Sequence, residues 1–280
     1  MSKVATTQPP TINFIGCGRV GKTLGLLWHQ HGVLQVQDVL TSSLTSAQAA
    51  VSFMGQGHAV AALADMRAAD FWLLAVPDRH IAGSAAALAD TQQPPAIAFH
   101  ASGAMAASEL KPLHASGWQT ASAHCLLSFA HAESATRQFA GTPCALEGDA
   151  MAQAALQALF DAIGAHCFGL NAEHKLLYHA AAVFGTNFLP VLQATAEALW
   201  QQSGLPAALV PQLRAALLHK AVDNLLALGP AGALTGPAAR GDLALVHRQA
   251  RALQSWDADM GAAYAALSTL AGRLARDGHL

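Results

Sequence analysis

A short apolar segment that leads into closely spaced glycines and then into a helical pattern constrains the fold of this chain more than any other feature. The segment reads Thr11-Ile-Asn-Phe-Ile-Gly16-Cys-Gly18-Arg-Val-Gly21. Gly16 would allow a tight turn off a strand, Gly18 would let the backbone approach a phosphate, and Gly21 would let a helix pack closely on that strand. The first helical turn would offer free N–H groups to the same phosphate. The pattern predicts a strand, a phosphate-binding loop and a helix.

The residues on either side of the glycines decide how this loop is interpreted. Ile12, Phe14 and Ile15 supply a buried strand, and residues 24–28 continue with apolar side chains at helical spacing. This context favours a dinucleotide-binding site over the two alternatives, an ordinary glycine-rich turn and the loop of a methyltransferase. The predicted cofactor-binding residues of the loop are Gly16, Cys17, Gly18, Arg19, Val20 and Gly21.

Length and composition narrow the classes of protein that remain. The 280 residues suffice for two domains, and a formal net charge of -2 with 11% charged residues excludes a basic surface for nucleic acid. Met1–Pro10 is polar and lacks the apolar core of a signal peptide, so we expect a short disordered leader. Four widely separated cysteines without a CxxC pair predict no metal site and suit reduced thiols in the cytoplasm.

Strand-like and helical segments alternate up to about residue 170, which is typical of a mostly parallel sheet covered on both faces. We predict strands at 11–15, 33–40, 59–62, 70–76, 96–100, 121–127, 143–146 and 166–170. Helices are predicted at 22–31, 46–54, 80–89 and 150–163, with Asp78 as the N-cap of the third. The expected organisation is an α/β dinucleotide-binding domain over residues 1–170 and an all-α domain for substrate binding and dimerisation over residues 171–280.

The run Leu176–Ala196 contains no charged residue and approaches the length of a membrane span. Its polar side chains would be costly in lipid, so we expect a helix buried in a domain or subunit core and no membrane partner. Pro190 should bend or break this helix. On a helical wheel, one face is apolar and the opposite face holds Lys175 and His179. The apolar face consists of Leu177, Phe184, Phe188, Val191 and Leu199.

Ligands of such sheets bind beyond the carboxyl ends of the strands, so the loops after strands are the candidate sites. After the second predicted strand come Thr41, Ser42 and Ser43, whose hydroxyls can bind a ribose phosphate. Asp38 stands where a ribose-binding carboxylate is expected, but Val39 and Leu40 continue the strand beyond it. We therefore favour NADP as the cofactor, with NAD as the alternative.

Two later loops are also candidates for cofactor contacts. The first contains Ala75, Val76 and Pro77, and the second contains Ser102 within His100-Ala-Ser-Gly-Ala104. The alternative interpretation of each is structural, as a helix start and as a glycine turn.

Three positions could act on a substrate. His124 ends a predicted strand and could bind substrate, although a lone histidine is more often structural. Lys175 and His179 could protonate the anion that hydride addition creates, or could simply form a solvated helix face. Arg240 could bind a substrate carboxylate or only pair with Asp242.

Taken together, these segments resemble a bacterial family of Rossmann-like proteins assigned as NADP oxidoreductases, with a C-terminal helical domain of unknown function. The matching segments are 15–21, Val76-Pro-Asp78, 100–103, 122–124, 175–183 with Asn187, 233–237 and 240–242. The arrangement is more distantly similar to pyrroline-5-carboxylate reductase, ketopantoate reductase and the β-hydroxyacid dehydrogenases. In the last two groups a lysine and an asparagine near the start of the interdomain helix serve catalysis and substrate binding.

This resemblance implies roles for Lys175 and Asn187 in catalysis, and the helical wheel adds His179 as a candidate. It also implies a homodimer formed through the helical domain. The function we predict is an NADP-dependent oxidoreductase that transfers hydride between nicotinamide and a small carbonyl, hydroxy-acid or imine substrate. The alternative is a dinucleotide-binding sensor or interaction module that catalyses nothing.

Overall fold

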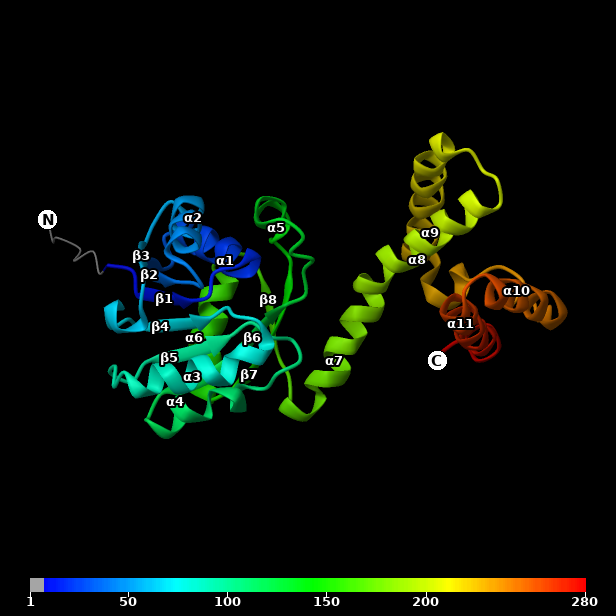
Figure 1. Cartoon of the computed structure of the whole chain (residues 1–280). Helices are drawn as coiled ribbons and strands as arrows, with labels where there is room; N and C mark the ends of the chain where they lie inside the picture. Colours follow the sequence, from blue (N-terminus) through cyan, green and yellow to red (C-terminus); the bar gives the residue numbers. More distant parts are fainter. Residues whose placement is uncertain (1–7) are drawn as a thin grey trace, which may run out of the picture. The chain divides into compact units, whose positions relative to one another are not determined.

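The computed structural model describes residues 8–280, and part of the predicted leader, residues 1–7, lies outside them. The chain forms two compact units, Met1–Thr186 and Asn187–Leu280 (Figure 1). The first contains the sheet and the second is helical.

An eight-stranded sheet organises the first unit, in the order β3-β2-β1-β4-β5-β6-β7-β8. Strands β6 and β7 are antiparallel, and every other neighbouring pair is parallel. The predicted Rossmann-like, mostly parallel architecture is confirmed. The strands are β1 Thr11–Ile15, β2 Gln35–Leu40, β3 His58–Val60, β4 Phe71–Leu74, β5 Ile97–His100, β6 Gln119–Cys125, β7 Pro143–Gly148 and β8 His166–Gly169.

Helices cover both faces of this sheet, because alternate strand residues point to opposite faces. Phe14 of β1 packs in the core on one face, and Ile15 packs in the core on the other. The first core includes residues of α1 Arg19–Gln30, α2 Leu44–Met54 and α6 Ala150–Asp161, and α5 Ala132–Gln138 packs on α1. The second core includes residues of α3 Ile81–Asp90 and α4 Lys111–Ala115.

The start of α3 differs from the prediction. Asp78 is not an N-cap, because it begins a 3₁₀ turn, Asp78–His80, and α3 follows at Ile81 without a side-chain cap. The short turn lets the chain leave β4 through Pro77 before the helix begins, and Pro77 itself occupies the preceding extended position with ψ of 145°.

A bend or break is predicted at Pro190, but Pro190 lies inside α8, and the irregularity is a π-helical turn that ends three residues before it. Helix α7 covers Lys175–Ala182, the π turn covers Val183–Asn187, and α8 covers Phe188–Gln202. Pro190 has no N–H to donate to a helical ladder, and a widened turn just before it accommodates the missing donor.

The second unit contains α8, α9 Val210–Ala233, α10 Leu243–Trp256 and α11 Ala258–Asp277. Helix α9 is interrupted at Gly229, where φ is 69° and Pro230 follows. Side chains of Asp242 and Asp257 cap α10 and α11 by accepting from Leu245 N and Met260 N. Among residues 8–280, no helix is both long and apolar enough to cross a bilayer.

Candidate functional site

A groove of about 650 Å³ lies at the carboxyl ends of β1, β2 and β4. The glycine loop, the end of β2 and the start of α3 form its walls. Its lining residues are Ile15, Gly16, Cys17, Gly18, Leu40, Thr41, Ser42, Ser46, Ala75, Val76, Pro77, Arg79, His80, Gly83, Ser84 and Ala87. The groove thus contains residues of the three loops after β1, β2 and β4 that the sequence predicted to bind a cofactor.

The three motif glycines differ in what a side chain would meet. At Gly16 the backbone has φ of 77°, and a Cβ would stand 2.6 Å from the carbonyl oxygen of Ala75, so the turn admits only glycine. At Gly21 a Cβ would lie 3.1 Å from Cys17 Sγ, within the close contact between α1 and the sheet. At Gly18 a Cβ would meet no protein atom within 4 Å. The protein itself does not need glycine at residue 18, so the open space suits a ligand.

The N-terminus of α1 faces this space without a side-chain cap. Cys17 is buried beside it, and burial raises the pKa of its thiol to about 12, so the thiol stays neutral. Arg19 points elsewhere, because its Nη1 donates to the carbonyl of Ala130 at 3.1 Å. Val20 and Gly21 belong to α1 and are not lining residues, so the loop contributes Gly16, Cys17 and Gly18.

The hydroxyls after β2 have different roles. Thr41 and Ser42 line the groove, whereas the Ser43 hydroxyl caps α2 by accepting from Ser46 N at 3.2 Å. Thr41 Oγ1 donates to the carbonyl of Ser43 at 2.9 Å, which fixes its rotamer and leaves its lone pairs available.

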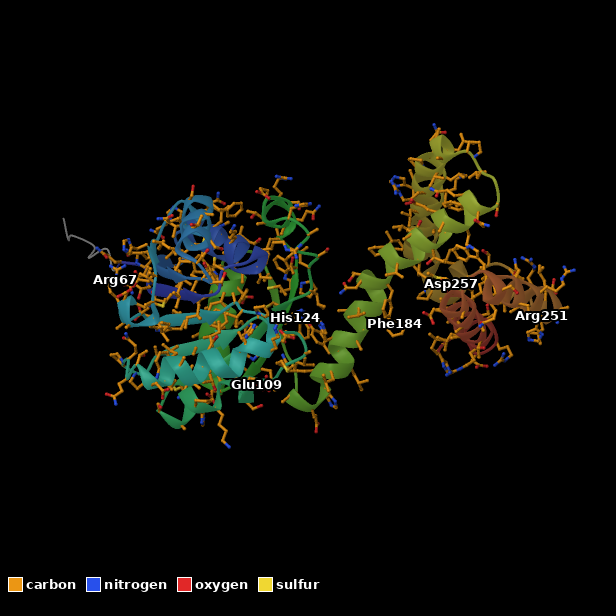
Figure 2. All side chains as sticks on the ribbon, viewed as in Figure 1. Arg67, Glu109, His124, Phe184, Arg251 and Asp257 are labelled. Carbon is orange, nitrogen blue, oxygen red and sulfur yellow. The ribbon has the colours of Figure 1, made fainter. Side chains whose placement is uncertain are left out.

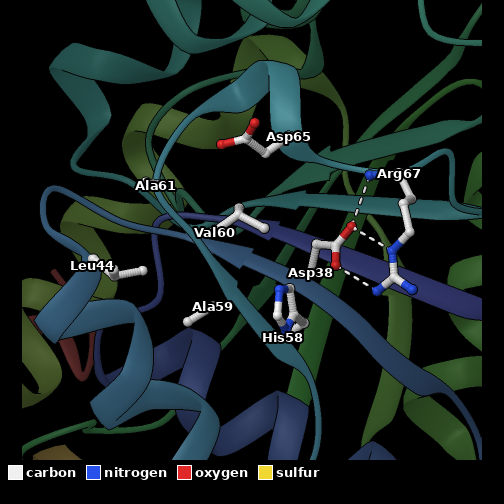
Figure 3. A pocket seen from close by; sticks show the side chains of 8 residues that line it. All are labelled: Asp38, Leu44, His58, Ala59, Val60, Ala61, Asp65 and Arg67. Carbon is white, nitrogen blue, oxygen red and sulfur yellow. Dashed lines mark hydrogen bonds and ion pairs between the residues drawn. The ribbon is translucent and has the colours of Figure 1, made fainter.

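Asp38 lies inside β2, as the sequence predicted, and its carboxylate is fully buried. Arg67 binds it twice, through Nε at 3.1 Å and Nη2 at 2.6 Å, and the Arg67 backbone N–H donates at 2.8 Å (Figure 3). A separate hollow of about 620 Å³ adjoins this pair at the edge strand β3. Both carboxylate oxygens of Asp38 are therefore bound by Arg67, and Asp38 does not line the groove.

The loop after β5 is a hydrogen-bonded turn. Ser102 N donates to Nδ1 of His100, and Ser102 Oγ accepts from the backbone of Ala104 and Met105. Nε2 of His100 then donates to the carbonyl of Ala106 at 3.0 Å. Burial lowers the pKa of His100 to about 4, so the ring is neutral. Ser102 thus shapes the turn, and its side chain is outside the groove.

Lys175 is almost completely buried, at 1% exposure, which rules out the solvated-face interpretation of this residue. Its Nζ donates to Ser122 Oγ at 2.8 Å and to the carbonyl of Ser102 at 3.3 Å. Ser122 Oγ donates to Glu147 Oε2 at 3.2 Å, and Ala107 N donates to the same oxygen at 2.7 Å. Burial lowers the pKa of Lys175, and the nearby Glu147 carboxylate opposes that shift.

His124 lies at the end of β6 (Figure 2). It is close enough to Lys175 for the ammonium to lower its pKa. Its Nδ1 is 3.0 Å from the Tyr178 hydroxyl, and its ring packs edge-on against His179 at 5.6 Å between centroids. Burial lowers the pKa of His124 to about 4, with smaller contributions from His179 and Lys175. The ring is therefore uncharged at neutral pH.

Gly103 allows the two imidazoles to approach the chain. A Cβ there would stand 2.5 Å from His179 Nδ1 and 2.7 Å from His124 Nε2. Within the described residues, His179 Nδ1 is buried without a hydrogen-bond partner. Among the same residues, His124 Nε2 also has no hydrogen bond to the protein. Such ring nitrogens are suited to bind a ligand.

The remaining predicted residues belong to the second unit. Asn187 precedes α8 at the end of the π turn. Arg240 is exposed in the loop before α10, where Asp242 caps the helix through Leu245 N. Across residues 8–280 no ion pair joins Arg240 to Asp242, so the pairing alternative is wrong.

Sequence reasoning missed Glu147, Gly103, Tyr178 and Arg79. Glu147 lies on an internal strand, where a charged residue is unusual and signals a buried partner. Tyr178 and Arg79 were both within segments that the sequence had singled out, but nothing in those segments indicated which neighbours they would contact.

Two family models match separate segments of the chain, and they meet before β7 rather than at the boundary between the two compact units. A family model described as a Rossmann-like domain matches residues 4–125, and one described as a domain of unknown function, DUF2520, matches residues 142–271. The chain joins a Rossmann-like domain to a DUF2520 domain. The second match includes β7 and β8, so His124 comes from the first domain and Glu147, Lys175 and Tyr178 come from the second. A comparison with curated protein sequences found no match.

Solved structures share the fold across nearly the whole chain. Protein TM1727 from Thermotoga maritima is 23% identical with a TM-score of 0.73, covering 95% of this chain and 99% of the other. A protein from Bacteroides fragilis, provisionally assigned as an NADP oxidoreductase, is 21% identical with a TM-score of 0.74 over 95% and 99% of the chains. An imine reductase from Myxococcus stipitatus, in complex with NADP+, is 16% identical with a TM-score of 0.66 over 96% of each chain.

Proposed function

We propose that this protein is an NADP-dependent oxidoreductase acting on a small carbonyl, hydroxy-acid or imine substrate. The groove is the observation that supports the proposal, because it joins an uncapped helix N-terminus, a glycine with an open side and the hydroxyls of Thr41 and Ser42. Its lining residues include no Asp or Glu, so nothing acidic repels a polyanionic ligand. Gly18 would contact the pyrophosphate, Ser42 would donate to the phosphate on the adenosine ribose, and Thr41, whose proton is used by the Ser43 carbonyl, would accept from a ribose hydroxyl.

The similar structures support the same cofactor. The imine reductase contains NADP+, and the Bacteroides fragilis protein is provisionally an NADP oxidoreductase. We assign cofactor binding to residues 1–170 and substrate binding and dimerisation to residues 171–280. A bound nicotinamide would supply or accept the hydride.

His124 is the group best placed to protonate the reduced substrate. The phenol of Tyr178 would donate to Nδ1 of His124, which leaves the ring proton on Nε2. When hydride addition places negative charge on a carbonyl oxygen, Nε2–H can pass its proton to that oxygen while Nδ1 takes the phenolic proton. Water would then return a proton to Tyr178, which is half-buried. His179 would be a second donor to the same oxygen.

Lys175 would act as a positioning cation. Its ammonium already donates to Ser122 and to the carbonyl of Ser102, so it orients β6 and the turn after β5 around His124. Asn187 and Arg240 are proposed as a catalytic amide and a substrate-binding cation.

The exposed apolar side chains support a homodimer through the helical region. In the first unit, Leu176 and Leu177 of α7 are 70% and 76% exposed in the single chain, and in the second unit Leu226 of α9 is 81% exposed. On each unit, a second copy would cover these apolar side chains. Sedimentation should give a dimer, and a monomer at every concentration would contradict this.

The unpaired cysteines suit the reducing cytoplasm.

Calorimetric titration with NADPH, NADH and S-adenosylmethionine tests the proposed function. NADPH should bind the protein more tightly than the other two ligands. Absence of NADPH binding would refute the function, and tighter binding of S-adenosylmethionine would favour a methyltransferase. A panel of small ketones, 2-hydroxy acids and cyclic imines, followed by NADPH absorbance, separates the remaining cases. Tight binding without turnover of any member would favour the sensor.

A further inference from the structure

We propose that Arg79 determines the cofactor preference by binding the phosphate monoester on the adenosine ribose. This inference rests on the proposed function, because it assumes that the groove holds a dinucleotide. It adds a specificity residue that the loops after β1 and β2 do not contain.

The groove contains Arg79 as well as the residues at the end of β2. Arg79 lies in the 3₁₀ turn Asp78–His80 that precedes α3, and it lines the groove together with Thr41 and Ser42. Arg79 is the only lysine or arginine among the residues that line the groove. The end of β2 has hydroxyls but no cation, and the turn before α3 supplies the missing charge from another part of the sequence.

One hydrogen bond orients the Arg79 guanidinium. Its Nε–H donates to Nε2 of His80 at 3.1 Å. Because this bond uses only the Nε edge, the four hydrogens of the two Nη groups stay available for phosphate oxygens. His80 lines the same groove, so the bond keeps the guanidinium beside it. Two Nη groups in one plane can bind a phosphate monoester bidentately.

Strand β2 offers no free carboxylate that could bind the hydroxyls of an unphosphorylated ribose. A ribose with free hydroxyls is usually bound by an Asp or Glu at the end of β2. Asp38 is the only carboxylate of that strand, and Arg67 neutralises it within the sheet. The groove therefore lacks the acceptor that would favour NAD, and it presents Arg79 to a phosphate that only NADP has.

Dissociation constants for NADPH, NADH, 2′,5′-ADP and 5′-AMP test the proposal, because binding can be measured without a substrate. Arg79→Ala should weaken the binding of NADPH and 2′,5′-ADP at least about tenfold, because one charge-assisted contact is lost. The dissociation constants of NADH and 5′-AMP should change less than about twofold. Arg79→Lys should recover part of the loss. Raising the salt concentration should weaken NADPH binding less in Arg79→Ala than in wild type.

Arg137→Ala is the matched control, because Arg137 is an exposed arginine of α5 outside the groove. It should bind all four ligands like the wild type. Thermal unfolding of each unliganded variant checks that the fold is intact. Equal weakening of NADPH and NADH by Arg79→Ala, or no weakening of either, would overturn the role of Arg79. If wild-type protein binds none of the four ligands, the proposed function itself fails.

Discussion

The ammonium of Lys175 lies 2.8 Å from the hydroxyl of Ser122 inside the first unit, where Lys175 is 1% exposed. That hydroxyl also donates to Glu147 on the neighbouring strand β7. One serine thus connects a buried cation on α7 to a buried carboxylate on the sheet. This connection places α7, and with it Tyr178 and His179, against the end of β6.

Removing the buried cation should destabilise the protein. Lys175→Met keeps the chain length but leaves Glu147 buried without its positive neighbour, so we expect a loss of about 3 kcal/mol in the free energy of unfolding. Chemical denaturation measures it. Lys111→Met, at an exposed lysine of α4, should change stability by less than about 0.5 kcal/mol. Equal stability of the two variants would show that the buried ammonium of Lys175 contributes nothing to stability.

Tyr178→Phe should affect the chemistry of His124 and leave cofactor binding unchanged. Without the phenol, Nδ1 of His124 loses the partner that we propose fixes its tautomer. Nitrogen-15 NMR should show a proton mainly on Nε2 in the wild type and on both nitrogens in the variant. The kcat for any substrate found should fall about 10- to 100-fold, with an unchanged dissociation constant for NADPH. A wild-type proton on Nδ1 would contradict the proposed relay.

Stability should fall as the pH is lowered from about 6.5 toward about 4. The pKa of His100 is lowered to about 4 by burial, whereas its ordinary value is 6.5. Between these values the unfolded chain binds a proton that the folded chain excludes, so acid favours unfolding. The contribution is up to about 3 kcal/mol, fully present above the ordinary pKa.

Urea unfolding between these pH values tests the contribution of His100. His100→Gln should flatten the pH dependence, whereas His166→Gln, at an exposed histidine, should leave the slope nearly as in wild type. A slope that is identical in all three proteins would exclude His100 as its source.

Substitutions at Gly16 and Gly18 should separate folding from cofactor binding. Gly16→Ala places a Cβ 2.6 Å from a backbone oxygen at positive φ, so we expect a loss of stability of about 2 kcal/mol. Gly18→Ala meets open space, so the unliganded protein should unfold like the wild type. Its methyl group would occupy the proposed pyrophosphate position, and NADPH should bind at least about tenfold more weakly. Wild-type NADPH affinity in Gly18→Ala would place the pyrophosphate elsewhere.

Local patterns predicted most of the fold. Every predicted strand is present, with bounds within a few residues of the prediction. Both faces of the sheet are covered by a core, so the strands are rich in apolar residues and can be recognised from the sequence. The interruption near Pro190 was also predictable, since a missing N–H is a property of the residue itself. Asp78 shows where local patterns fail, because the 3₁₀ turn that displaced the N-cap depends on how β4 leads into α3.

The sequence by itself determined the glycine loop, the alternation of strands and helices, and the position of Asp38 within its strand. These properties depend on residues that are neighbours along the chain. Tertiary structure decided which of the candidates meet. It buried Lys175, which the helical wheel had left open to solvent, and it brought Tyr178 against His124 and Arg79 into the same groove as Thr41 and Ser42. Such contacts join residues far apart in sequence, and the packing of helices on the sheet sets them.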